Sequence, residues 1–142
     1  MENKAQTRVL VISGDDTTTE LLNLNLEPKA FEVFHAHSGP QGIEATRVVN
    51  PEVVILDLLS PDTDSWEICK QVRENSRAPI LVLSPLNKPG IAARLLDEGA
   101  DDYLQKPIPR GILVAHVRRL ARRARAEKEA ASSQFKSNNI IN

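Results

Sequence analysis

Three polar side chains that can handle a phosphoryl group accompany three different apolar runs of the chain. Asp57 lies within VVILDLL, Ser84 ends APILVLS, and Lys106 follows DYLQ. A carboxylate can act as a nucleophile, while a hydroxyl and an ammonium group can hold the oxygens of the group being transferred. If the fold brings them together, these three side chains predict phosphoryl chemistry at a carboxylate.

The segments that must position these side chains have the pattern of five strands alternating with five helices. Three of the apolar runs are continuous, which is typical of strands buried on both faces. The intervening segments have helical spacing, and in the first of them Leu21, Leu22 and Leu26 fall on one side. This alternation predicts an α/β fold, a doubly wound, five-stranded parallel sheet with helices on both faces. The predicted strands are 8–13, 31–37, 53–59, 78–84 and 102–105, and the predicted helices are 19–26, 42–49, 66–72, 91–96 and 112–120.

Polar residues also follow the first predicted strand, in the run Ser13-Gly14-Asp15-Asp16. In an open parallel sheet, ligands bind at the carboxyl ends of the strands, near the point where the strand order reverses. The ends of the first, third, fourth and fifth strands are therefore expected to form one site.

Composition excludes several classes of protein. The chain has 142 residues, of which 41% are hydrophobic and 26% charged, as expected for a single globular domain. Its single cysteine, Cys69, excludes an internal disulfide and a cysteine-rich metal site. There is neither an apolar run long enough to span a bilayer nor a secretory signal pattern. We expect a cytoplasmic protein that makes no contact with a membrane.

Charge is distributed unevenly along the chain. Up to Gln105 there are 9 Lys and Arg against 17 Asp and Glu, a net charge of −8, whereas from Lys106 onward there are 9 against 2, a net charge of +7. The basic segment centres on RRLARRAR, residues 118–125. Such a segment binds nucleic acid or an acidic partner in some proteins, but more often it is the solvated face of a helix, which we favour. Residues 126–142 are polar, so we expect the domain to end at residue 125 and a fraying helix to lead into a linker.

Three segments resemble the receiver domain of two-component response regulators. They are VVILDLLSPDTDSWEICKQVR, LVLSP and GADDYLQKP, and the resemblance extends over roughly residues 8–123. It implies a flavodoxin-like sheet with strand order 2-1-3-4-5. It also implies that Asp57 is the phosphoacceptor, Ser84 the switch hydroxyl and Lys106 the partner of the phosphoryl group. Tyr103 would be the aromatic residue whose rotamer reports activation, and the peptide bond from Lys106 to Pro107 would be cis.

The arginine-rich last helix and the ending FKSNNIIN resemble the OmpR/PhoB subfamily. In that subfamily a linker leads into a winged-helix DNA-binding domain, and FKSNNIIN is either linker or the first residues of such a domain. The resemblance implies a sensor histidine kinase as the phosphodonor partner. It also implies a transcription regulator that contacts DNA only through an effector domain outside this chain.

The resemblance breaks at the metal site. The family binds Mg²⁺ with two adjacent acids after the first strand, with the phosphoacceptor, and with the backbone carbonyl at the position of Leu59. The two acid positions are Ser13 and Gly14 here, and Asp15 comes one step too late. Mg²⁺ requires near-octahedral oxygen ligands at about 2.1 Å. We therefore expect Mg²⁺ binding to be weak or absent, with Asp15 as a doubtful ligand that is better explained as a helix N-cap.

Two further features affect the predicted switch. Asp57 and Lys106 have a summed charge of zero, so they can form a direct ion pair without a metal ion. Pro85, directly after Ser84, has no N–H to give to a phosphoryl oxygen. The leading hypothesis is a receiver that functions without phosphorylation. A conventionally phosphorylated receiver and a pure protein-interaction module stay open, whereas an enzyme is disfavoured because Leu59 replaces the second aspartate of an aspartyl-phosphate phosphatase.

The resemblance also implies a self-dimer through the fourth helix, the fifth strand and the fifth helix. Charged pairs typically cross that interface, and several are altered here. For Ile112 a core position is as acceptable as an interface position, and for His116 we expect an exposed imidazole. The corresponding pairs in this sequence are Ala92 with Ile112, Asp102 with His116, and Asp101 with Arg118.

Overall fold

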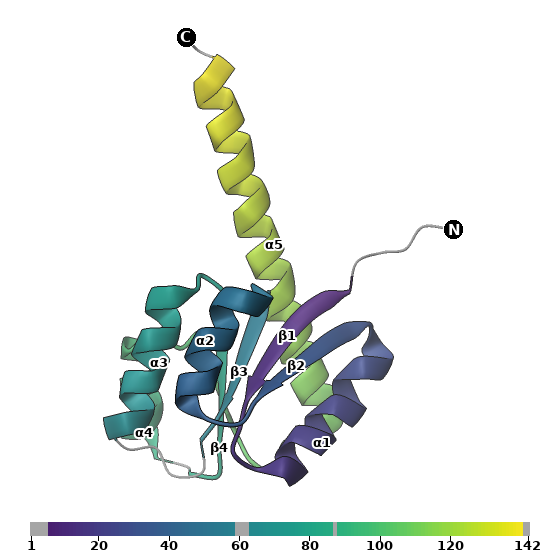
Figure 1. The fold of residues 1–142 in the computed structure, drawn as a ribbon, viewed down its shortest axis with the longest axis vertical. Helices are drawn as coiled ribbons and strands as arrows, with labels where there is room; N and C mark the ends of the chain where they lie inside the picture. The colour runs from purple at the N-terminus through teal and green to yellow at the C-terminus, as the bar shows by residue number, and fades with distance from the viewer. Residues whose placement is uncertain (1–5, 59–62, 87, 141–142) are drawn as a thin grey trace.

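The computed structural model describes residues 6–58, 63–86 and 88–140, in which five strands alternate with five α-helices (Figure 1). The strands are β1 (Thr7–Ile12), β2 (Phe31–Ala36), β3 (Val53–Asp57), β4 (Ile80–Ser84) and β5 (Asp102–Gln105). The helices are α1 (Asp16–Leu26), α2 (Gly39–Val49), α3 (Thr63–Asn75), α4 (Pro89–Asp97) and α5 (Arg110–Ile140), with a short 3₁₀ helix, η1 (Glu27–Lys29), after α1. Every predicted strand and helix is present.

α1 and α2 begin earlier than their apolar periodicity indicates because capping residues start them. Asp15 and Ser38 are the N-caps of α1 and α2, and their side chains accept hydrogen bonds from backbone N–H groups two or three residues later. The first turns are polar, since the free N–H groups there need such acceptors. The apolar pattern therefore begins only after each cap.

All five strands are parallel, in the order β2-β1-β3-β4-β5, which confirms the predicted topology. β3 and β4 are buried along their whole length. The strand order reverses between β1 and β3, so the carboxyl ends of these two strands lie beside each other. This edge of the sheet is the one at which the sequence predicts a site.

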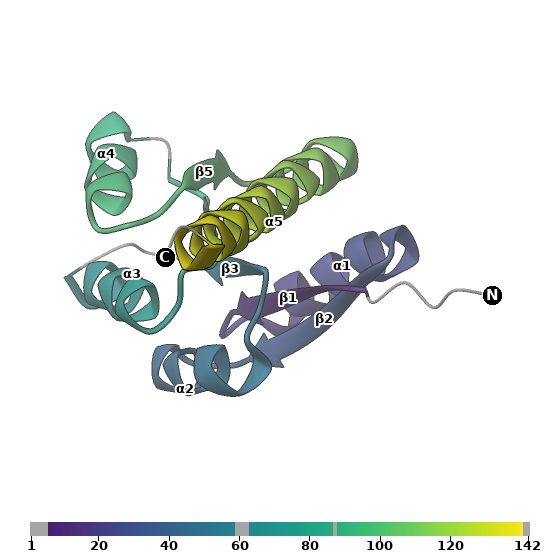
Figure 2. The same cartoon turned by 90° about the horizontal axis from the view of Figure 1, so that it is seen from above.

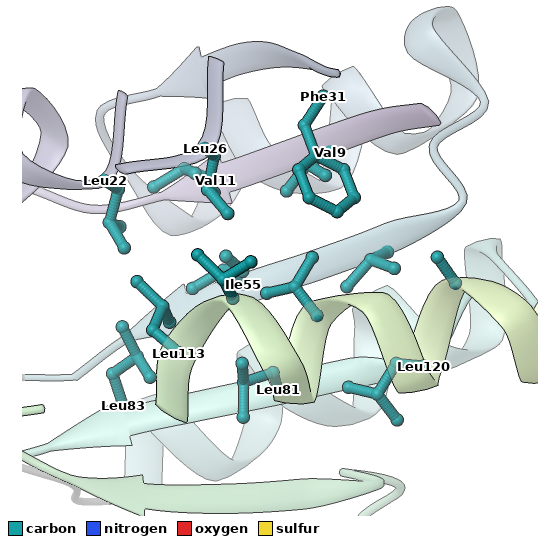
Figure 3. Packing of buried hydrophobic residues seen from close by; sticks show 14 residues of the cluster. Val9, Val11, Leu22, Leu26, Phe31, Ile55, Leu81, Leu83, Leu113 and Leu120 are labelled. Carbon is teal, nitrogen blue, oxygen red and sulfur yellow. The ribbon is translucent and has the colours of Figure 1, made fainter. Parts of the chain in front are cut away.

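Helices lie on both faces of the sheet (Figure 2), and a hydrophobic layer packs between the sheet and the helices on each face. Successive residues of a strand point to opposite faces, so Val9 and Val11 belong to one layer and Leu10 and Ile12 to the other. The first layer contains α1 and α5, and Figure 3 shows its residues from these two helices and the strands between them. The second layer contains buried residues of α3 and α4, with partly buried residues of α2 packed against it.

One predicted helix face is only partly correct. Leu22 and Leu26 of α1 are buried in the first layer, as expected. Leu21, which the helical spacing assigns to the same side, is 55% exposed. Because adjacent helical residues are about 100° apart, burial of Leu22 and Leu26 turns Leu21 towards the rim of the contact.

α5 is longer than expected. It has 31 residues, and it continues as a helix past Arg125 to Ile140, where the sequence predicts a fraying end. In Figure 1 this last part of α5 extends away from the sheet. The stretch after Arg125 has no Gly or Pro before Ile140 and is rich in Ala, Glu and Lys, which favour helix even without packing. None of the described helices is sufficiently long and apolar to cross a membrane.

Close packing of α2 on β1 depends on Gly42. A Cβ atom there would lie 2.4 to 2.8 Å from three side-chain carbons of the buried Ile12. We expect Gly42→Ala to lower the free energy of unfolding by about 1–3 kcal/mol through overpacking, although alanine is the better helix former. Gly90→Ala is the control, because a Cβ atom at Gly90 meets nothing within 4 Å. Urea unfolding measures both, and a Gly42→Ala variant as stable as the control would contradict the packing argument.

Candidate functional site

The carboxylate of Asp57 is buried at the carboxyl end of β3, with its side chain 1% exposed. Ser13, which follows β1, donates its hydroxyl to Asp57 Oδ2 over 2.8 Å. The Lys106 ammonium, which follows β5, forms an ion pair with Asp57 Oδ1. Both carboxylate oxygens are therefore engaged by side chains of the protein, and the ion pair expected from the charges is present.

Neighbouring elements fix the position of Lys106. Its backbone N–H donates to the carbonyl of Ser84 over 2.8 Å, which continues the pairing of β4 with β5. Its ammonium also donates to Thr18 Oγ1 over 3.2 Å. The peptide bond between Lys106 and Pro107 is cis, as expected. Lys106 thus joins the start of α1 to the end of β3.

Asp15 is bound to its own helix. Its carboxylate accepts the Thr17 backbone N–H over 3.2 Å and the Thr18 hydroxyl over 2.8 Å, which confirms the expected N-cap. The hydrogen bond from Thr18 is the main reason that the pKa of Asp15 lies below its ordinary value. Thr18 was not singled out from the sequence, because its link to Lys106 joins residues 88 positions apart. Thr18 therefore links Asp15 to Lys106, while Asp15 makes no direct bond to Asp57 among the described contacts.

Ser84 and Tyr103 contact the same residue of the β4–α4 loop. Ser84 is fully buried, and its Oγ accepts the backbone N–H of Leu86 over 3.2 Å. The Tyr103 hydroxyl donates to the Leu86 carbonyl over 2.6 Å. Pro85, between Ser84 and Leu86, has no N–H of its own. Within the described part of the chain, the two residues that the resemblance assigns to the switch thus hold a loop residue and make no bond to Asp57.

The described residues provide few ligands for a divalent cation. No group of three or more His, Cys, Asp or Glu side chains there could hold a metal ion. The two acid positions of the family carry a hydroxyl at Ser13 and no side chain at Gly14. Leu59, whose backbone carbonyl the resemblance implies as a ligand, lies outside the described residues.

Acids at the start of β5 are paired within the chain. Asp102 accepts from His116 Nδ1 over 2.5 Å and from Arg119 over 2.8 Å. Asp101 pairs with Arg73 of α3 at 2.5 Å and with Arg123 of α5. The expectation of an exposed imidazole at His116 is wrong, because the ring lies against β5 with its side chain 25% exposed.

The other residues of the expected dimer surface differ in their placement. Ile112 is 47% exposed, which excludes a core position, and Ala92 is half-buried on α4. Arg118 is exposed and lies beside Phe31 and Arg122, away from Asp101. On α5, the face that meets Asp101 and Asp102 carries residues 116, 119 and 123, which are three or four positions apart. This helical spacing would have identified Arg119 and Arg123 in place of Arg118.

Comparison with known proteins agrees with this architecture. The family model for the response regulator receiver domain matches residues 9–118. The transcriptional regulatory protein CseB of Streptomyces avermitilis is 36% identical over 118 residues, which cover 83% of this chain and 50% of CseB. ResD, a transcriptional regulatory protein of Bacillus subtilis, is 31% identical over 124 residues, covering 87% of this chain and 52% of ResD. The chain spans about half the length of these curated relatives.

Solved structures show the same fold. A two-component response regulator from Clostridium difficile superposes with a TM-score of 0.77 and 30% identity, covering 83% of this chain and 98% of the other. The receiver domain of the Francisella response regulator 1452 gives a TM-score of 0.75 and 26% identity, with coverage of 83% and 98%. The strand order, the residues at the carboxyl edge of the sheet and these matches agree. The chain therefore belongs to the response regulator receiver domain family.

Proposed function

We propose that this chain is the receiver of a two-component transcription regulator and that it functions without Mg²⁺-dependent phosphorylation of Asp57. Asp57 is instead held in an ion pair within the protein. The observation that carries the proposal is the occupation of both Asp57 oxygens, one by the Ser13 hydroxyl and the other by the Lys106 ammonium. In this state the pocket needs no cation to balance its charge. It is a signalling module and not an enzyme.

The charges around Asp57 indicate that the pocket binds Mg²⁺ only weakly. A cation at the carboxylate would compete with Lys106 and Ser13 for its two oxygens, and it would find no second carboxylate at Ser13 or Gly14. Recruitment of Asp15 would break its hydrogen bonds to Thr17 and Thr18, which cap α1. Mg²⁺ gives up its water ligands reluctantly, so a site with one available carboxylate binds it poorly.

The loop after β4 supports the same conclusion. Ser84 Oγ accepts the N–H of Leu86, so its hydroxyl hydrogen is the one donor that Ser84 could offer to a phosphoryl oxygen. Pro85 would supply no backbone N–H beside it. A phosphoryl group on Asp57 would therefore receive few hydrogen bonds from this loop.

The proposed partners follow from the family and the relatives. CseB and ResD are named transcriptional regulatory proteins, and they extend well beyond the matched segment. We assign DNA recognition to an effector domain of that kind, and a sensor histidine kinase is the partner if Asp57 is phosphorylated. A second copy is proposed to pack on the α4–β5–α5 surface, where Ile112 is exposed and Asp102 is already paired. The proposed location is the cytoplasm.

Intact mass after incubation with acetyl phosphate and Mg²⁺ tests the proposal. We expect no mass gain on the wild-type chain, with circular dichroism confirming that it is folded. Asp57→Asn is the control for phosphorylation at other residues. A stoichiometric gain of one phosphoryl group, absent in Asp57→Asn, would overturn the proposal and establish a conventional switch.

A further inference from the structure

An open groove of about 240 Å³ lies at the amino-terminal edge of the sheet, opposite the Asp57 pocket. It is bounded by the first residues of β1 and β2, by the end of η1 and by the middle of α5. Its charged lining residues are Lys29, Arg118, Arg122 and Arg125, and no carboxylate lines it. The groove is therefore strongly cationic on a chain whose net charge is −1.

The structure divides the arginines between residues 118 and 125 of α5 into two groups. Arg119 and Arg123 are paired with acids of β5 and its flank, and Arg125 is paired with Glu52 at 2.9 Å. Arg118 and Arg122 are exposed, and like Lys29 they have no ion pair or side-chain hydrogen bond within the described ranges. The groove thus carries three cations that form no ion pair with any described side chain.

The groove offers charge but no large exposed apolar side chain. Phe31 and Ala121 are each only 4% exposed, because they belong to the first hydrophobic layer, and its exposed apolar residue is the small Ala30. A protein partner usually anchors on exposed aromatic or aliphatic groups at the centre of an interface. Contacts to a nucleic acid backbone need only cations and hydrogen-bond donors. Duplex DNA therefore fits this surface better than an acidic protein does.

The spacing of the free arginines also matches a phosphate backbone. Arg118 and Arg122 are one helical turn apart, about 6 Å along the axis of α5. One strand of B-DNA places a phosphate every 3.4 Å or so along its axis, so two phosphates separated by one nucleotide are within reach of the two side chains. Guanidinium groups suit phosphate because they present paired donors.

We propose that Lys29, Arg118 and Arg122 form a phosphate-backbone contact for duplex DNA on the receiver itself. The contact is independent of base sequence, because no side chain of the groove is placed to read base edges. It lies at the opposite edge of the sheet from Asp57 and does not rest on the state of that pocket. In a longer protein it adds affinity to DNA held by an effector domain.

Fluorescence anisotropy with a labelled duplex of about 20 base pairs and the full chain tests this contact. At about 50 mM salt we expect measurable binding, with log K falling against log salt at a slope of about −2 to −3 for three phosphates. Arg118→Ala/Arg122→Ala is expected to bind at least tenfold more weakly and to reduce the magnitude of the slope by about two. Lys70→Ala/Lys88→Ala is the matched control, since it removes the same net charge from exposed positions elsewhere.

Three results would overturn the proposal. The first is the absence of wild-type binding at low salt. The second is an equal loss in the two double variants, which would make the effect one of net charge alone. The third is binding of polyglutamate, or of vesicles of anionic phospholipid, at least as tightly as duplex DNA and with the same dependence on Arg118 and Arg122. That result would assign the groove to another class of partner. The groove variants leave Ser13, Asp57 and Lys106 unchanged, which keeps this test separate from that of the Asp57 pocket.

Discussion

Replacing Lys106 with methionine is expected to lower the free energy of unfolding by about 3–5 kcal/mol. The Asp57 side chain is 1% exposed, and Lys106 provides the only positive charge bonded to it among the described residues. Methionine keeps most of the side-chain volume, so the loss reflects an uncompensated buried carboxylate more than a cavity. Urea unfolding followed by circular dichroism measures the change.

A double-mutant cycle separates this effect from simple misfolding. Asp57→Asn alone is expected to cost less, because Lys106 is 20% exposed and keeps the Thr18 hydroxyl as an acceptor. Asp57→Asn/Lys106→Met is expected to be more stable than Lys106→Met, since no charge is then left buried. If the double variant is less stable than Lys106→Met, the ion pair is not the source of the loss.

Restoring the two family acids, as Ser13→Asp/Gly14→Asp, is expected to create a Mg²⁺ site. Three carboxylates would then surround one lysine, and their mutual repulsion would be relieved by a divalent cation. A side chain is sterically acceptable at Gly14, because a Cβ atom there meets only the His37 carbonyl oxygen at 3.6 Å. We expect Mg²⁺ affinity to rise at least tenfold and the melting temperature to become dependent on Mg²⁺. Isothermal titration and thermal unfolding with and without Mg²⁺ measure these changes.

The neutral pair Ser13→Asn/Gly14→Asn is the matched control for this gain. It has similar side-chain volumes but adds no charge, so its stability is expected to be independent of Mg²⁺. Gain of one phosphoryl group by the acidic variant, but not by the wild type, would support the proposed function. If the acidic variant remains folded but does not bind Mg²⁺, the absence of the two acids is not the cause of weak Mg²⁺ binding in the wild type.

The fold was predictable from the sequence because its signals are local. Continuous apolar runs, helical spacing and breakers such as Asn50-Pro51 each depend on a few neighbouring residues. The strand order came from the resemblance to receivers, and the structure confirms it. The end of α5 was not predicted, because a polar sequence without Gly or Pro is compatible with both a helix and a linker.

The Asp57 pocket was predictable in part. The ion pair with Lys106 followed from counting charges at one edge of a parallel sheet, and the N-cap at Asp15 followed from its position. The hydrogen bond from Ser13 to Asp57 could not be predicted from the sequence, because it joins residues 44 positions apart at the ends of neighbouring strands. It depends on the register of β1 with β3, which a single sequence does not specify.

The fold class and the loss of the usual acid pair, at Ser13 and Gly14, can both be inferred from the sequence. Which arginines of α5 are neutralised and which are free depends on the packing of the whole domain. Arg119 and Arg118 are adjacent and chemically identical, yet one meets Asp102 and the other lines the cationic groove. The rotation of α5 about its axis makes this difference. It is set by the packing of residues such as Leu113, Val117 and Leu120 against the sheet, which is a property of the whole core.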